Sequence, residues 1–132
     1  MLSNSRNFIV SNRLVILYLL MLLNHVAHIM EEIWGRFWIL NHISLGWFLT
    51  INWVLLCIPA ILFYFVLNNK RRAYILSIVY AAFMAIQGIG HNVITIIAGK
   101  YFDGFAGGFT GIGLFIIGSA LFYYLLKEIQ TK

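Results

Sequence analysis

The chain has 132 residues, of which 62% are hydrophobic, 17% aromatic and only 10% charged. Soluble domains carry roughly a quarter charged residues, so too few charges remain here to cover a water-soluble surface. The net charge of +5 would suit nucleic acid if the basic residues formed a stripe. They lie instead at the ends of apolar runs, where basic residues orient membrane segments and contact anionic lipid. These totals predict one integral membrane domain over residues 1–132, with membrane lipid and no nucleic acid as a partner.

Four apolar runs are each long enough to cross a bilayer, which takes about 20 residues of helix. In chain order they cover residues 14–34, 46–67, 73–98 and 107–126. None of them alternates as a barrel strand would, and helices satisfy their own backbone hydrogen bonds in lipid. Because the connections are short, successive helices should run antiparallel. The sequence therefore predicts an all-α fold, an up-down bundle of four transmembrane helices.

The basic residues are distributed unequally between the two sides of such a bundle. One side carries Arg6, Arg13, Lys70, Arg71, Arg72, Lys127 and Lys132, whereas the other carries Arg36 and Lys100. Basic residues are retained on the cytoplasmic side of a membrane. We therefore expect a multi-pass protein of the cell membrane with both termini in the cytoplasm.

The first apolar run ends in a cluster of polar and ionisable residues. They are Asn24, His25, His28, Glu31 and Glu32. At about 100° per residue, all of them fall within an arc of about 120°. Ionisable groups inside a membrane span cost free energy unless they face a partner or water, so this arc should line a polar cavity. The sequence does not say whether Glu31 or Glu32 faces that cavity.

The other three runs carry polar residues at a similar depth. The third run presents a face composed of Tyr80, Met84, Gln87, Gly88, His91, Asn92 and Thr95. The second run contributes Asn52 and the fourth contributes Thr110. In the expected topology these groups lie roughly 10 Å below the non-cytoplasmic surface. We therefore predict a four-helix site, supported by Asn24, Asn52, Gln87, Asn92 and Thr110.

Imidazoles and carboxylates three or four residues apart on a helix are common metal ligands. The predicted ligands of a zinc-like divalent transition metal are His28, His91 and Glu32, and His25 could replace one of them. The metal would polarise water, and Glu31 or Glu32 would act catalytically as the general base. This pattern favours a metal-dependent hydrolase or an acid/base enzyme acting on a lipid-like or amphiphilic substrate.

Three other functions fit the same residues. Carboxylates, imidazoles and amides inside a membrane also build proton and cation relays, which would make the protein a transporter. Haem held between His28 and His91 is a second alternative. In the third, the polar groups hydrogen-bond across helices and stabilise a non-catalytic accessory protein. The sequence thus leaves open whether the protein is an enzyme.

The fourth run and the residues before it are rich in glycine. Glycines four residues apart occur at Gly104/Gly108 and Gly107/Gly111. Small residues at this spacing let another helix approach closely. The strip predicts either packing within the bundle or a homodimer interface through this helix.

One set of motifs resembles a known family. The sequence H-x-x-E-E, from His28 to Glu32, stands near the end of the first span, and Gly90-His91-Asn92 follows downstream. Together with Tyr101-Phe102-Asp103-Gly104 and the glycine-rich last helix, these motifs resemble the HXXEE family of small bacterial and archaeal integral membrane proteins. One departure is Asp103, where the family pattern has proline. The resemblance covers most of the chain and implies a membrane site, but it implies no particular activity.

Overall fold

The computed structural model describes residues 10–97 and 108–130. These residues form four α-helices and one short 3-10 helix, and they contain no strand. In chain order the elements are α1 (Asn12–Trp34), η1 (Trp38–Asn41), α2 (Leu45–Leu67), α3 (Arg71–Ile97) and α4 (Gly108–Gln130). Each α-helix is long and apolar enough to cross a membrane. The all-α prediction and the four candidate spans are confirmed.

The observed helix bounds differ from the predicted ones by one to four residues. Helices α1, α2 and α3 begin at Asn12, Leu45 and Arg71, slightly before their apolar runs. Helix α4 ends at Gln130 rather than at residue 126. A hydropathy pattern stops at the last apolar residue, whereas the helix continues through Lys127, a cation that interacts favourably with a helix C-terminus. The predicted bounds at 98 and 107 lie outside the described residues.

Side-chain caps explain where two of the helices begin. The Ser11 hydroxyl oxygen accepts a hydrogen bond of 3.2 Å from the backbone N–H of Leu14 at the start of α1. The Ser44 hydroxyl oxygen accepts one of 3.3 Å from the N–H of Trp47 at the start of α2. Serine is favoured at this position because its oxygen satisfies an N–H that has no partner within the helix.

The ends of α1 and α2 share one turn geometry. Arg36 and Asn69 adopt left-handed backbone conformations, with φ of 51° and 56°. At α1, the N–H of Phe37 donates to the Glu32 carbonyl oxygen at 2.8 Å, the long-range bond of a Schellman motif. The chain therefore reverses sharply at Arg36, and Phe37 returns toward the interior.

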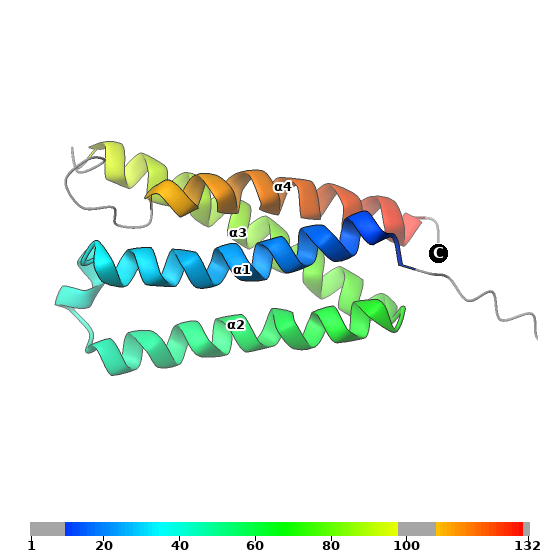
Figure 1. Ribbon diagram of the computed structural model, residues 1–132, viewed down its shortest axis with the longest axis horizontal. Coiled ribbons are helices and arrows are strands. Elements are labelled where there is room, and N and C mark those ends of the chain that lie inside the picture. Colours follow the sequence, from blue (N-terminus) through cyan, green and yellow to red (C-terminus); the bar gives the residue numbers. More distant parts are fainter. Residues whose placement is uncertain (1–9, 98–107, 131–132) are drawn as a thin grey trace, which may run out of the picture.

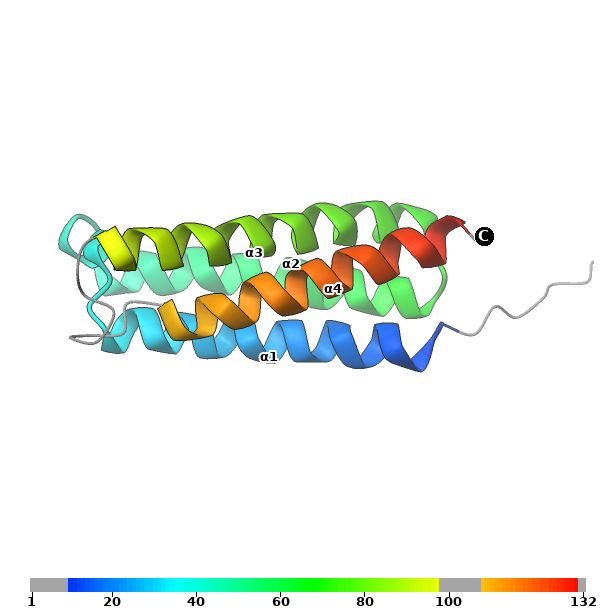
Figure 2. The same ribbon diagram turned by 90° about the horizontal axis from the view of Figure 1, so that it is seen from above.

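The helices lie side by side along the length of the molecule (Figure 1 and Figure 2). The C-terminal ends of α1 and α3 lie at the same end as the N-terminal ends of α2 and α4 (Figure 1). We call this the site end, and we call the half of the bundle nearer residues 10 and 130 the terminal end. Helix α2 is the least enclosed, since its buried residues are Phe48, Pro59 and Val66.

Small residues bring α3 and α4 into close contact. A Cβ atom at Gly88 would lie 2.7 Å from the backbone nitrogen of Phe115 on α4. A Cβ atom at Gly118 would lie 3.0 Å from the carbonyl oxygen of Ala81 on α3. Packing within the bundle therefore uses several glycines of the two helices. Gly104 and Gly107 lie outside the described residues, and a homodimer through α4 stays a prediction.

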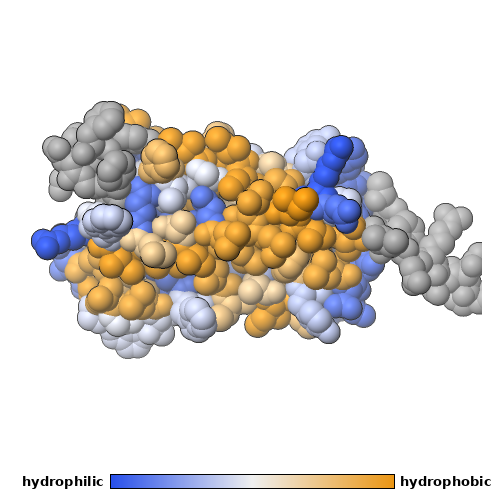
Figure 3. All heavy atoms as spheres, in the orientation of Figure 1, coloured by the Kyte–Doolittle hydropathy of each residue, from blue (hydrophilic) through white to orange (hydrophobic). Residues whose placement is uncertain are grey.

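Apolar side chains fill the terminal end and also cover the outside of the bundle. Leu14, Tyr74, Leu121 and Leu125 are buried there. Hydrophobic residues dominate the middle of the visible surface, and hydrophilic residues gather toward its two ends (Figure 3). This distribution matches that of helices long enough to span a bilayer.

Candidate metal centre

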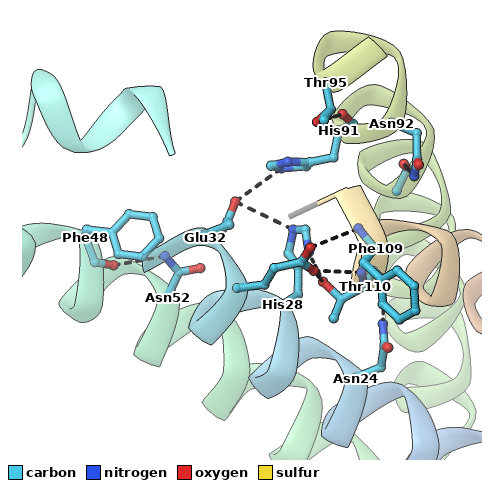
Figure 4. Close-up of polar contacts among 12 residues, drawn as sticks. Asn24, His28, Glu32, Phe48, Asn52, His91, Asn92, Thr95, Phe109 and Thr110 are labelled. Carbon is cyan, nitrogen blue, oxygen red and sulfur yellow. Dashed lines mark hydrogen bonds and ion pairs between the residues drawn. The ribbon is translucent and has the colours of Figure 1, made fainter. Parts of the chain in front are cut away.

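Three ionisable side chains meet at the site end of the bundle (Figure 4). His28 and Glu32 are one turn apart on α1, and His91 reaches them from α3. The Glu32 Oε1 atom lies 3.6 Å from Nε2 of His28 and 3.2 Å from Nε2 of His91. All three residues are buried, with exposed fractions of 1% for His28, 3% for Glu32 and 7% for His91. The structure thus brings together the three predicted ligands from two helices.

The distances from Glu32 to the two histidines are close to the spacing of ligand atoms around one metal ion. Zinc binds imidazole nitrogen and carboxylate oxygen at about 2.0–2.1 Å in tetrahedral geometry, which places two ligand atoms about 3.3 Å apart. The two Glu32 distances are 3.2 and 3.6 Å. The ligand atoms of all three residues lie within 4.8 Å of one another. The three residues are therefore a candidate set of ligands for one ion.

His28 is held by a hydrogen bond that determines which ring nitrogen carries its proton. Its Nδ1 atom lies 2.9 Å from the hydroxyl oxygen of Thr110 on α4. When the Glu31 carboxylate is ionised, that hydroxyl donates its single proton to Oε2 of Glu31 and accepts a hydrogen bond from Nδ1–H of His28. Nε2 of neutral His28 therefore carries a lone pair rather than a proton.

This Nε2 atom is buried and has no hydrogen-bond partner among the described residues. Its lone pair lies near a carboxylate oxygen of Glu32. Two electron-rich atoms that face each other in a water-poor interior repel, unless a proton or cation lies between them. The arrangement is therefore suited to bind a positive charge.

The two adjacent glutamates have different surroundings. Glu32 faces the histidines, whereas the Glu31 carboxylate accepts hydrogen bonds from the backbone N–H groups of Phe109 at 2.9 Å and Thr110 at 2.7 Å. These N–H groups belong to the first turn of α4, which has unsatisfied donors and a partial positive charge. Glu31 caps α4, and Glu32 is the glutamate of the three-residue cluster.

His25 lies outside this cluster. Its Nδ1 atom lies 3.2 Å from the hydroxyl oxygen of Tyr80 on α3, and both residues are buried. His25 precedes His28 by about 4.5 Å along the helix axis, which takes it deeper into the bundle. The structure does not bring His25 to the three ligands, and its use as a replacement ligand stays a prediction.

Two of the predicted supporting residues join α1 to α4 at this site. Thr110 contacts both His28 and Glu31 through its hydroxyl group. The Asn24 side-chain amide donates to the Thr110 carbonyl oxygen at 3.0 Å. The first turn of α4 is thus attached to α1 by both the side chain and the backbone of one residue.

The other supporting residues contribute less directly to the cluster. Asn52 and Asn92 each donate a side-chain hydrogen bond to a carbonyl oxygen one turn earlier in their own helix, at 3.0 and 2.8 Å. Gln87 is half-buried on α3, one turn before His91. Asn52 of α2 therefore bonds within its own helix, and the three-residue cluster is built by α1 and α3 and supported by Thr110 of α4.

Phe37 is a site residue that the sequence pattern missed. Its ring centroid lies 4.7 Å from that of His91, and the His91 ring meets the His28 ring edge to face at 4.5 Å. The Schellman turn after α1 places Phe37 there. The available signal was Gly35 next to the end of the first apolar run, because glycine often accompanies a helix-terminating reversal.

Comparison with known proteins adds no assignment. The sequence matches no family model, no curated protein and no solved structure. The resemblance to the HXXEE family accordingly stays a prediction based on its motifs.

Proposed function

We propose that this protein is a multi-pass membrane protein that binds a divalent transition metal such as zinc through His28, Glu32 and His91. The observation that carries the proposal is the buried Nε2 atom of His28, which has no hydrogen-bond partner among the described residues. It lies close to Glu32, and His91 approaches the same carboxylate oxygen. A metal ion between these atoms would use all three lone pairs and offset the cost of burying them.

In this proposal the helices form an up-down bundle in the cell membrane with both termini in the cytoplasm. The positions of the helix ends in Figure 1 support it. Arg13 at the start of α1, residues 70–72 at the start of α3 and Lys127 in the last turn of α4 all belong to the terminal end, whereas Arg36 belongs to the site end. The positive-inside rule then orients the site end toward the outer side.

The proposed chemistry follows from the number of ligands. Three protein ligands leave a fourth position for water or substrate, as in catalytic zinc sites. A metal there would activate water for hydrolysis, or support acid/base chemistry, on a lipid-like or amphiphilic substrate. Both oxygens of Glu31 already accept hydrogen bonds from α4, so the proposal does not use Glu31 as the general base.

Metal analysis of the detergent-purified protein tests the proposal. After incubation with zinc and removal of free metal, we expect about one zinc per chain, the stoichiometry of a single site. His28→Ala and His91→Ala should lose it. His42→Ala is the matched control, because His42 is exposed in the segment between η1 and α2. If the wild type retains no more zinc than His28→Ala, the metal site is excluded.

A further inference from the structure

We infer that Thr110 and Glu31 are positioning residues that hold His28 in its Nδ1-protonated form, so that a bare Nε2 faces the metal position. The effect on metal binding rests on the metal site proposed above. The protonation state of His28 can be measured without metal. It assigns Glu31 a role different from that of a general base. It also makes the first turn of α4 part of the metal centre.

The direction of each hydrogen bond follows from the groups involved. The backbone N–H groups of Phe109 and Thr110 can only donate, and the Glu31 carboxylate in its ionised form can only accept. The Thr110 hydroxyl has one proton, which it donates to Glu31. Its oxygen is then left to accept from Nδ1 of His28, 2.9 Å away. The chain of bonds runs one way, from His28 through Thr110 to Glu31.

The position of Thr110 is itself determined by α1. Its backbone N–H donates to Glu31 at 2.7 Å, and its carbonyl oxygen accepts from the Asn24 amide at 3.0 Å. Asn24 fits there because residue 113 on α4 is glycine, and a Cβ atom at Gly113 would collide with the Asn24 amide. These two bonds to α1 fix the position of Thr110, and with it the position of its hydroxyl group relative to His28.

Thr110→Val is the sharpest test, because valine keeps the shape of threonine and removes the hydroxyl. Nδ1 of His28 then loses its Thr110 partner, whereas a proton on Nε2 would face Glu32, whose Oε1 lies 3.6 Å away. We expect the proton to move from Nδ1 to Nε2. In that form His28 cannot bind a metal through Nε2. Thr110→Ser keeps the hydroxyl and should behave like the wild type.

Nitrogen NMR of metal-free, histidine-labelled protein in detergent with EDTA reads the protonation state directly. The His28 signals can be assigned by their loss in His28→Asn. We expect a protonated Nδ1 and a bare Nε2 in the wild type and in Thr110→Ser, and the reverse in Thr110→Val. Thr50→Val is the control, since the Thr50 hydroxyl is exposed on α2 and donates within its own helix to Gly46.

The zinc dissociation constant provides the second measurement. Loss of a group that orients a metal-bound histidine typically weakens binding about 10- to 100-fold, which is the change expected for Thr110→Val. A wild-type His28 protonated on Nε2, or a Thr110→Val variant that changes neither the NMR signals nor the dissociation constant, would overturn the inference. If the NMR signals behave as expected while the wild type binds no zinc, the inference holds and the proposed function fails.

Discussion

The two ends of the bundle bury polar groups in different ways. At the terminal end, the hydroxyl groups of Tyr18 and Ser77 lie 2.8 Å apart and satisfy each other among buried leucines. At the site end, His28, Glu32 and His91 meet, and Nε2 of His28 has no hydrogen-bond partner among the described residues. The same helices thus build one region whose buried polar groups pair with each other and one in which a buried ring nitrogen has no partner among the described residues. The difference is the reason why we propose a metal site at the site end and a purely structural role for the terminal end.

The largest expected effect is a loss of unfolding free energy when a buried leucine of the terminal end is shortened. Leu121 is fully buried in the terminal end, so Leu121→Ala leaves a cavity there, and such substitutions cost about 2–5 kcal/mol. Unfolding in detergent should show this loss, while the zinc content stays that of the wild type. Ile116→Ala is the control, because Ile116 is exposed on the same helix. Loss of zinc in Leu121→Ala at temperatures where the protein is folded would contradict the independence of the two ends.

The next effect belongs to the site end. A ligand that binds only the folded state stabilises it by about 2.7 kcal/mol at a concentration 100 times its dissociation constant. Zinc should therefore raise the unfolding temperature of the wild type, and EDTA should reverse the change. His91→Ala should show no such increase, since it removes the ligand that α3 supplies. An equal increase in His91→Ala would locate the zinc elsewhere.

A smaller effect tests the paired hydroxyls of the terminal end. Tyr18→Phe removes one hydrogen bond and leaves Ser77 without that partner, which should cost about 0.5–2 kcal/mol of unfolding free energy. Ser77→Ala should cost a similar amount. In the double variant the two losses should not add, because both remove the same bond. Additive losses would show that the hydroxyls do not stabilise each other.

The smallest expected effect is the change in stability when a left-handed residue after a helix is replaced by glycine. Arg36 follows α1 at the site end and Asn69 follows α2 at the terminal end, both with left-handed backbones. Glycine adopts this conformation without steric cost, and asparagine tolerates it better than arginine does. Arg36→Gly should therefore stabilise the protein by about 0.5 kcal/mol, and Asn69→Gly by less. Thermal unfolding of both variants would measure the difference, and a larger gain for Asn69→Gly would contradict it.

Much of the fold could be predicted because the bilayer requires it. The apolar runs are long enough to span a membrane, and all four appear as helices. The buried face of α1 was also readable, because His25, His28 and Glu32 recur at helical spacing and all three are buried. The same periodicity identified the buried face of α3 that carries Gly88, His91 and Thr95.

The division of roles among these residues depended on contacts between helices. Glu31 and Glu32 are adjacent and lie on the same broad arc, so periodicity could not distinguish them. The first turn of α4 decides between them, because its N–H groups bind Glu31 and leave Glu32 to the histidines. In the same way His25 pairs with Tyr80 of α3 rather than with the cluster.

The sequence by itself determined that four apolar helices would have to bury histidines and glutamates near one end. It could do so because hydropathy and helical periodicity are properties of a single segment. Only the tertiary structure decided which nitrogen of His28 is bare and which glutamate it faces. Those outcomes depend on Thr110 and His91, which are more than 60 residues away along the chain. Distances between helices of this kind are not encoded in the spacing of residues within one helix.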